Sequence, residues 1–278
     1  MTYSTPLTAN YGMNGTITLG DDARFAVAGD WHGRGTWAVQ ALKAMSLNGI
    51  HTVYHVGDFG FWPGREGQKY IKALTRQAAL YDQVIYVTMG NHEDYTQINA
   101  IPVSEDGLQW VSERIAVMPR GFRWTIADTT CVSFGGAASL DYADRREGID
   151  WWREEAITMG DVYRLAEHGS ADLMISHDAP NGISPLEFLK KDPNGFSVEA
   201  IEYSNQSRAM MDAAISIIQP KILFHGHYHT YYDEQTEFDG FSTRCIGLNR
   251  DLYENNVSIF DLESQTSTMI QVASWESK

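Results

Sequence analysis

Cysteine is nearly absent from this sequence, which has only two cysteines in 278 residues. Two cysteines cannot form the network of disulfide bonds that stabilises small secreted domains. Cys131 and Cys245 both lie in apolar, strand-like segments, so we expect two buried free thiols. Structural zinc sites depend on clustered thiolates, and the lack of such clusters excludes that type of site as well.

Long hydrophobic runs and a basic N-terminal segment are also missing. No apolar run approaches the length of a transmembrane helix, and residues 1–15 have neither the basic nor the apolar region of a signal peptide. We therefore expect a cytoplasmic protein that does not contact a membrane. The sequence has no repeat and no low-complexity linker, so one domain spanning residues 1–278 is the simplest organisation.

Positive charge is scarce, because 21 Lys and Arg residues face 36 Asp and Glu residues, for a formal net charge of −15. An acidic surface repels polyanions, which disfavours extended binding to DNA or RNA and weakens a nuclease hypothesis. A small phosphate ester, such as a nucleotide, remains a compatible substrate if bound cations reverse the field locally. The oligomeric state stays open.

Short segments rich in β-branched and aromatic residues alternate with helical patterns. The predicted strands are residues 24–29, 51–57, 84–90, 172–176 and 221–226, and the predicted helices are 36–47, 68–80 and 198–218. This alternation favours parallel strands, whereas residues 123–134 predict a hairpin turning near Asp128 and residues 241–272 predict an antiparallel meander. The mixture predicts an α/β fold with two packed mixed β-sheets flanked by helices.

Each of the five predicted strands is followed by one or two residues that can bind a metal or act in catalysis, namely aspartate, asparagine or histidine. They are, in chain order, Asp30 and His32, Asp58, Asn91 and His92, His177, and His227 and His229. Each one alone has an ordinary explanation as a turn former, a helix cap or a surface group. Because ligands of open α/β sheets bind at the carboxyl ends of strands, the occurrence at all five ends favours one shared site.

Carboxylate, carboxamide and imidazole groups together suit Mn, Fe, Co, Ni or Zn better than calcium. Two ions roughly 3.5–4 Å apart need a ligand that spans both, and a carboxylate can do so. Such a pair generates hydroxide from bound water and neutralises phosphate oxygens during in-line attack. The residue types therefore predict two divalent metal ions and hydrolysis of a phosphate ester.

These segments resemble the motifs of the calcineurin-like metallophosphoesterase superfamily. The matching motifs are Asp30-x-His32, Gly57-Asp58, Gly90-Asn91-His92-Glu93, an isolated His177 and Gly226-His227-x-His229, in the superfamily's order. The resemblance implies a four-layer αββα sandwich with a dinuclear metal site at the strand ends. It assigns Asp30, His32 and His229 to the first metal, Asn91, His177 and His227 to the second, and Asp58 to both.

The same resemblance implies that His92 is a catalytic residue and not a metal ligand. It would steady the charge of the phosphoryl group or protonate the leaving oxygen. Two differences from the motifs of other superfamily branches exclude some activities. The segment after Asp58 lacks the acid and arginine of protein phosphatases, and Phe61 occupies the position of the tyrosine ligand of purple acid phosphatases. The Gly-His-x-His ending is similar to phosphodiesterase and nuclease branches.

Substrate contacts are less clearly marked. Residues 135–155 resemble small phosphoesterases of actinobacteria and their phages, and Arg145 and Arg146 within them either contact a phosphate or lie on the solvated surface. We expect loops at residues 141–155 and 180–196. One or two aromatic residues near the motifs are expected to stack on a nucleobase, from the set Trp31, Phe59, Phe61, Trp62 and Tyr95.

The leading hypothesis is a dinuclear-metal-dependent phosphoesterase that favours phosphodiesters, with cyclic nucleotides among the candidates, and that uses a metal-bridging hydroxide. A phosphomonoesterase or nucleotide pyrophosphatase on the same site is the alternative within enzymes. A non-catalytic metal-binding scaffold is the alternative from another class. The remaining histidines, His51, His55, His168 and His225, are expected to be structural.

Overall fold

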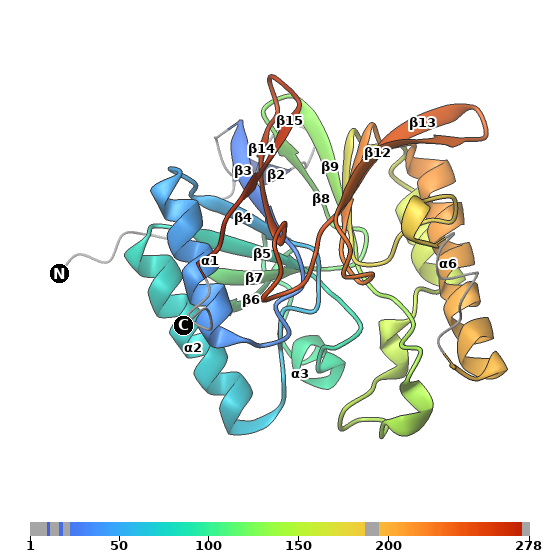
Figure 1. Ribbon diagram of the computed structural model, residues 1–278, viewed down its shortest axis with the longest axis horizontal. Helices are drawn as coiled ribbons and strands as arrows, with labels where there is room; N and C mark the ends of the chain where they lie inside the picture. Colours follow the sequence, from blue (N-terminus) through green and yellow to red (C-terminus); the bar gives the residue numbers. More distant parts are fainter. Residues whose placement is uncertain (1–9, 12–16, 19–22, 187–194, 274–278) are drawn as a thin grey trace.

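The computed structural model describes residues 10–11, 17–18, 23–186 and 195–273. Within them, two mixed β-sheets pack against each other and helices cover both outer faces (Figure 1). The seven-stranded sheet has the order β15 (Thr266–Ile270), β14 (Val257–Asp261), β3 (Arg24–Ala28), β4 (Thr52–His55), β5 (Val84–Thr88), β7 (Ile115–Met118) and β6 (Gln109–Ser112). The predicted αββα fold class is confirmed.

The second sheet has eight strands among the described residues. Their order is β1 (Asn10–Tyr11), β2 (Ile17–Thr18), β8 (Arg123–Ile126), β9 (Thr129–Phe134), β10 (Leu173–Ser176), β11 (Ile222–His225), β13 (Phe241–Gly247) and β12 (Tyr232–Phe238). The helices α1 (Gly35–Leu47) and α2 (Gly64–Leu80) cover the seven-stranded sheet. On the opposite side, α4 (Met159–Ala166) and α6 (Val198–Ile218) cover the eight-stranded sheet.

The core lies in three apolar layers because strands such as β3 are buried on both faces. Alternate side chains of a strand point to opposite faces, so Phe25 and Val27 pack between the sheets while Ala26 and Ala28 pack against the helices. This is why β3 reads as a continuous apolar run and not as an alternating one. Between the sheets, the Trp124 indole donates a hydrogen bond of 3.0 Å to the Tyr54 hydroxyl.

Most of the predicted elements are confirmed, and α6 has the predicted bounds. The predicted hairpin at residues 123–134 is present as β8 and β9. The predicted meander at residues 241–272 is wrong, because β13 pairs with β11 and β12 in one sheet while β14 and β15 pair in the other. Elements outside the predicted set are β1, β2, β6, β7, β12, α4 and the short helix α3 (Tyr95–Asn99).

The first predicted loop contributes Asp141 and Arg145 to the edge where the five strands end. Residues 141–155 hold only two short 3-10 turns, η1 (Tyr142–Asp144) and η2 (Arg153–Glu155), besides irregular backbone. The second predicted loop, residues 180–196, lies partly outside the described residues. Both cysteines are buried free thiols, as expected. Of the described helices, none is long and apolar enough to cross a membrane.

Candidate metal centre

Five parallel strands from both sheets end at one edge of the sandwich. The strands β3, β4 and β5 are parallel neighbours in the seven-stranded sheet, and β10 and β11 are parallel neighbours in the eight-stranded sheet. The loops that follow these strands carry all the predicted metal ligands and His92. The site therefore draws on both sheets and depends on how they pack together.

The carboxylate of Asp58 lies at the centre of the cluster and is 1% exposed. Its Oδ2 is 3.4 Å from Nε2 of His32, which follows a strand of the seven-stranded sheet. Its Oδ1 is 3.4 Å from Nε2 of His177, which follows a strand of the other sheet. Because its two oxygens face histidines from different sheets, Asp58 is placed as a bridging carboxylate would be.

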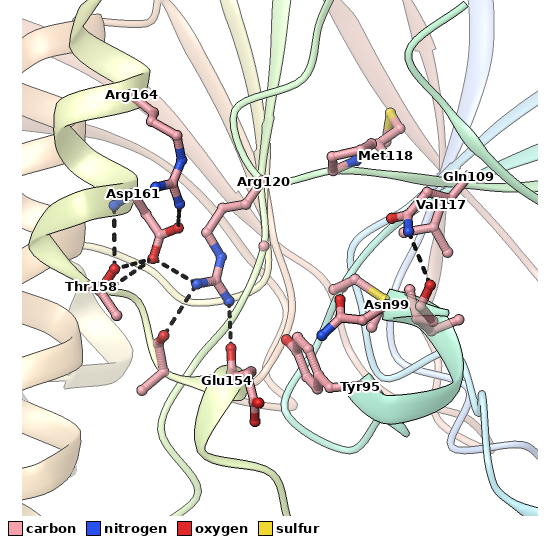
Figure 2. A pocket seen from close by; sticks show the side chains of 15 residues that line it. Tyr95, Asn99, Gln109, Val117, Met118, Arg120, Glu154, Thr158, Asp161 and Arg164 are labelled. Carbon is pink, nitrogen blue, oxygen red and sulfur yellow. Dashed lines mark hydrogen bonds and ion pairs between the residues drawn. The ribbon is translucent and has the colours of Figure 1, made fainter. Parts of the chain in front are cut away.

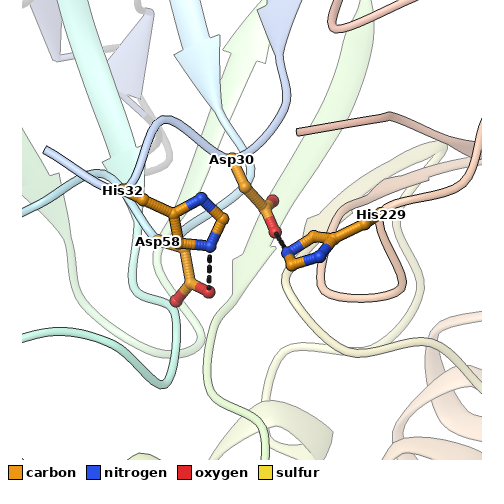
Figure 3. Close-up of side chains that lie close together, drawn as sticks. All are labelled: Asp30, His32, Asp58 and His229. Carbon is orange, nitrogen blue, oxygen red and sulfur yellow. Dashed lines mark ion pairs between the residues drawn. The ribbon is translucent and has the colours of Figure 1, made fainter. Parts of the chain in front are cut away.

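Asp30, His32, Asp58 and His229 form the first group of potential ligands (Figure 3). One ligand atom from each residue lies within 4.8 Å of those of the other three. Oδ2 of Asp30 is 3.1 Å from Nε2 of His229, and the rings of His32 and His229 meet edge to face. These four side chains could hold one divalent cation.

Asn91, His177 and His227 form the second group, next to Oδ1 of Asp58. Oδ1 of Asn91 is 2.9 Å from Nε2 of His177, and the ring centroids of His177 and His227 are 5.0 Å apart. Nitrogen and oxygen donors of this kind suit first-row transition metals. The structure thus brings the other six predicted ligands into the neighbourhood of Asp58.

Hydrogen bonds to groups outside the cluster orient the rings of His177 and His32. Nδ1 of His177 lies 3.0 Å from the carbonyl oxygen of Val56, and Nδ1 of His32 lies 2.9 Å from Oδ1 of Asp251. Both partners only accept hydrogen bonds, so Nδ1 carries the proton in each ring and Nε2 faces the cluster as a potential ligand. The sequence analysis did not identify Asp251, which follows no predicted strand.

The buried carboxylates of the cluster favour positive charge on the neighbouring histidines. Burial opposes protonation of His32, but hydrogen bonds with Asp251 and Asp58 raise its pKa to about 10. Burial also opposes protonation of His177, yet Asp58 raises its pKa to about 9. Despite burial, the nearby histidines hold the pKa of Asp58 well below its usual range. Protons on the histidines thus compensate the negative charge of the buried carboxylates. Bound cations would provide the same compensation.

Ser139 and Glu155 fix the orientation of the Asn91 amide, and the sequence analysis missed both. The Ser139 hydroxyl accepts a hydrogen bond of 2.9 Å from Nδ2 of Asn91 and donates one of 2.8 Å to Glu155. The backbone N–H of Ser139 donates to the same carboxylate at 2.7 Å. With its amide nitrogen held in this way, Asn91 presents its oxygen to the cluster. Burial raises the pKa of Glu155 to about 7.

Arg120 fixes the loop that carries Glu155. Its guanidinium donates to the backbone carbonyl oxygens of Glu154, Glu155 and Ala156 at 3.0, 3.2 and 3.1 Å, and to the Asp161 carboxylate at 2.8 Å. Figure 2 shows the bonds from Arg120 to Glu154 and Asp161 in the wall of a pocket of about 380 Å³. A chain of contacts therefore runs from Arg120 through Glu155 to the metal centre.

Glu93, the last residue of the Gly-Asn-His-Glu motif, shapes the loop after Asp58. Its buried carboxylate accepts hydrogen bonds from the backbone N–H groups of Phe59, Gly60 and Phe61 at 2.6, 3.2 and 2.8 Å. Burial and the charge of Asp58 raise the pKa of Glu93 to about 7, against the effect of these donors. Glu93 is thus a structural member of the motif that holds Asp58 in place.

His92 lies beside the cluster and contacts one of the two predicted arginines. Its backbone N–H donates to Oδ1 of Asp58 at 2.8 Å, and its Nε2 is 3.1 Å from a guanidinium nitrogen of Arg145. A guanidinium only donates, so Nε2 of His92 is the acceptor. Burial, together with Arg145, lowers the pKa of His92. The Arg146 side chain is 71% exposed and pairs with Asp150.

A cleft of about 720 Å³ opens over the centre. Besides Asp58, Asn91, His92, His227 and His229, it is lined by Arg145 and by residues of α6. Of the aromatic residues proposed to stack on a base, four are at most 6% exposed and belong to the core: Trp31, Phe59, Phe61 and Tyr95. Trp62 is 42% exposed and is the member of this set that solvent reaches.

Backbone conformation at the centre is unusual. His32, Asp58, His227 and His229 have φ values of 44°, 51°, 65° and 51°, in the left-handed region that residues other than glycine rarely adopt. Such strain clusters at functional sites, where the surrounding structure imposes it. His225, one residue before the turn, is buried in β11 and bonds to the Tyr232 hydroxyl, so it is a core residue as expected.

Two motif glycines are required by close approach of the ligands. A Cβ atom at Gly226 would lie 2.1 Å from Oδ1 of Asp30, and one at Gly90 would lie 2.2 Å from Oδ1 of Asp58. Side chains at these positions would displace the two carboxylates of the cluster. Glycine is therefore needed at both positions because the carboxylates of Asp30 and Asp58 occupy the space that a side chain would fill.

Comparisons with known proteins agree with the αββα fold. The family model for calcineurin-like phosphoesterases matches residues 23–231. A crystal structure from Thermus thermophilus superposes with a TM-score of 0.53 at 11% identity, covering 90% of this chain and 99% of that one. A dimetal phosphatase from Danio rerio superposes with a TM-score of 0.50 at 11% identity, covering 86% and 92%. A search of curated proteins returned no match.

The contact between Gly226 and Asp30 can be tested with Gly226→Ala. The added methyl group would displace the Asp30 carboxylate, so we expect Mn²⁺ affinity, measured by isothermal titration calorimetry, to fall about 10-fold or more. Gly160→Ala is the matched control, because a Cβ at this helical position meets no atom closer than 3.6 Å. Equal Mn²⁺ affinity in both variants would contradict the steric argument.

The role of Ser139 can be tested with Ser139→Ala. Without its hydroxyl the Asn91 amide is free to rotate, so we expect the affinity for the second Mn²⁺ equivalent to fall about 10- to 100-fold, with smaller effects on the first. The control is Ser133→Ala, which removes another buried hydroxyl, one that bonds to Thr88. If both variants bound two equivalents like the unmodified protein, Ser139 would have no orienting role.

Proposed function

The chain belongs to the calcineurin-like phosphoesterase family, and on that premise we propose that it is a metal-dependent phosphoric ester hydrolase that favours phosphodiesters. The observation that carries the proposal is the position of Asp58, whose two carboxylate oxygens face His32 on one side and His177 on the other. The candidate ligands His32 and His177, which follow strands of different sheets, support a shared role for this carboxylate. The same cleft offers a histidine and an arginine for the phosphoryl group.

We assign the ligands of one divalent ion to Asp30, His32 and His229, those of a second to Asn91, His177 and His227, and Asp58 to both. Two buried carboxylates support this assignment, since Asp30 and Asp58 have no Lys or Arg ion-pair partner among the described residues. When bound, such ions lower the pKa of water and neutralise phosphate charge. The donor set suits Mn, Fe, Co, Ni or Zn.

His92 acts on the phosphoryl group or on the leaving oxygen in this proposal. Its backbone bond to Asp58 fixes its loop beside the cluster, and Nε2 faces Arg145. A phosphate oxygen is a stronger acceptor for a guanidinium than a neutral imidazole is. Substrate would therefore take the Arg145 hydrogen bond and free Nε2 of His92, which must itself bind a proton before it can protonate the leaving oxygen. Arg145 thus positions the phosphate, while Arg146 has no contact that supports such a role.

Variants of Asp58 and His92 distinguish metal binding from action on the phosphoryl group or leaving oxygen. We expect Asp58→Ala to abolish activity and to weaken metal binding, because it removes the shared carboxylate. We expect His92→Ala to lower kcat about 10²- to 10⁴-fold, the usual contribution of a general acid or base, with metal content nearly unchanged. Steady-state kinetics and metal analysis of the same preparations provide the measurement. Loss of metal from His92→Ala would refute the separation.

The substrate class is tested with bis-p-nitrophenyl phosphate and p-nitrophenyl phosphate, each with added Mn²⁺, Zn²⁺, Co²⁺ or Ni²⁺. We expect a higher kcat/KM for the diester with at least one metal. A preference for the monoester would favour the phosphomonoesterase alternative. Absence of both bound metal and hydrolysis under every condition would favour a non-catalytic scaffold. A panel of 2′,3′- and 3′,5′-cyclic nucleotides then tests the nucleotide hypothesis.

A further inference from the structure

Two pockets meet at the His92–Arg145 pair. The first, the α6 pocket, is the cleft of about 720 Å³ over the metal centre; its outer wall includes Leu140, Leu186, Phe196, Ile201 and Arg208. The second, the Trp62 pocket, has a volume of about 450 Å³ and is lined by Trp62, Pro63, Ile149, Asp150 and Trp152 besides His92 and Arg145. The two residues expected to handle the phosphate thus form the boundary between two separate spaces.

The Trp62 pocket is walled by two fixed indole rings. The Trp62 Nε1–H donates to the backbone oxygen of His92 at 3.2 Å, and the ring packs closely over Gly33. The Trp152 Nε1–H donates to the Thr96 hydroxyl at 2.8 Å. Rings held in this way offer a flat apolar surface with little conformational entropy left to lose, which suits a planar aromatic group.

The α6 pocket combines apolar and polar walls. Phe196 is 40% exposed and Leu186 is buried beside it, whereas Arg208 adds a cationic group on α6. The Arg208 guanidinium donates to two neutral acceptors of its own helix, Ser204 and Asn205, and has no carboxylate ion pair among the described residues. This larger pocket suits a bigger group with both apolar and polar parts, such as a nucleoside.

A phosphomonoester carries one organic group, whereas a phosphodiester carries two. We propose that the two pockets each hold one of the two groups esterified to the phosphate, a planar aromatic group against Trp62 and a larger, nucleoside-like group against α6. This inference rests on the proposed function and adds the subsites that select the substrate. It identifies Trp62 and Phe196 as specificity-determining residues on opposite sides of the His92–Arg145 pair.

The test compares Trp62→Ala and Phe196→Ala in the Mn²⁺-loaded enzyme with two diesters. Bis-p-nitrophenyl phosphate has a large group on both sides, whereas methyl p-nitrophenyl phosphate has p-nitrophenol as the leaving group and only a methyl group on the other side. We expect each variant to lower kcat/KM for the first ester roughly 10-fold, as loss of a stacking contact does. With the methyl ester, the variant whose pocket holds the p-nitrophenol leaving group still lowers kcat/KM. The other variant has no effect, because its pocket receives only the methyl group.

Two further variants exclude indirect effects. Trp62→Phe keeps an aromatic face but loses the hydrogen bond to His92, and we expect it to retain most of the activity that Trp62→Ala loses. Tyr163→Ala removes an aromatic side chain that is 67% exposed and lines neither pocket, so kcat/KM should not change. Metal content and thermal unfolding of every variant show whether the centre and the fold are intact.

Several outcomes would overturn the subsites. They fail if neither alanine variant affects the diester, if both variants lose the same factor with both esters, or if Trp62→Phe is as impaired as Trp62→Ala. The last result would mean that Trp62 acts only by positioning His92. An unmodified protein that binds metal but hydrolyses neither ester would instead refute the proposed function, which distinguishes the two failures.

Discussion

Burial of the Asp58 carboxylate between the two sheets is the constraint on which the centre depends. An ionised carboxylate that is removed from water costs several kcal/mol unless positive charge compensates it. Here that compensation comes from His32 on one sheet and His177 on the other, so the carboxylate joins the two halves of the sandwich. Because metal ligands must be deprotonated on Nε2, cations and protons compete for the same positions, and metal binding releases protons.

The groups around this carboxylate are held by layers of contacts that extend away from it. Glu93 binds three backbone N–H groups of the loop that follows Asp58, and Asp251 fixes the ring of His32. On the Asn91 side, Ser139 and Glu155 serve the same purpose. Partners of this kind orient metal ligands and usually matter nearly as much as the ligands themselves. They also account for backbone conformations that would be unstable in isolated loops.

Sequence patterns predicted the parts of this site that are local in the chain. A β-branched run followed by a polar residue marks each strand end. Long-range contacts left no such signal. Ser139 and Glu155 lie in an irregular segment, and β13 pairs with β11 and not with β14, because pairing between distant strands is decided by packing. Burial explains why most nearby aromatic residues serve the core while Trp62 does not.

Local charge in the cleft differs from the charge of the whole chain. The net charge of −15 repels a polyanion at long range, yet screening confines that effect to about 8–10 Å at physiological ionic strength. Arg145 and Arg208 bring two positive charges to the cleft, and Asp141, which pairs with Arg145 at 2.7 Å, brings one negative charge. Bound cations would exceed the charge of the buried Asp30 and Asp58 carboxylates. A small ester that enters the cleft meets this local field, whereas a long nucleic acid must also lie along the acidic surface. The same charge distribution therefore favours small phosphate esters over polymers.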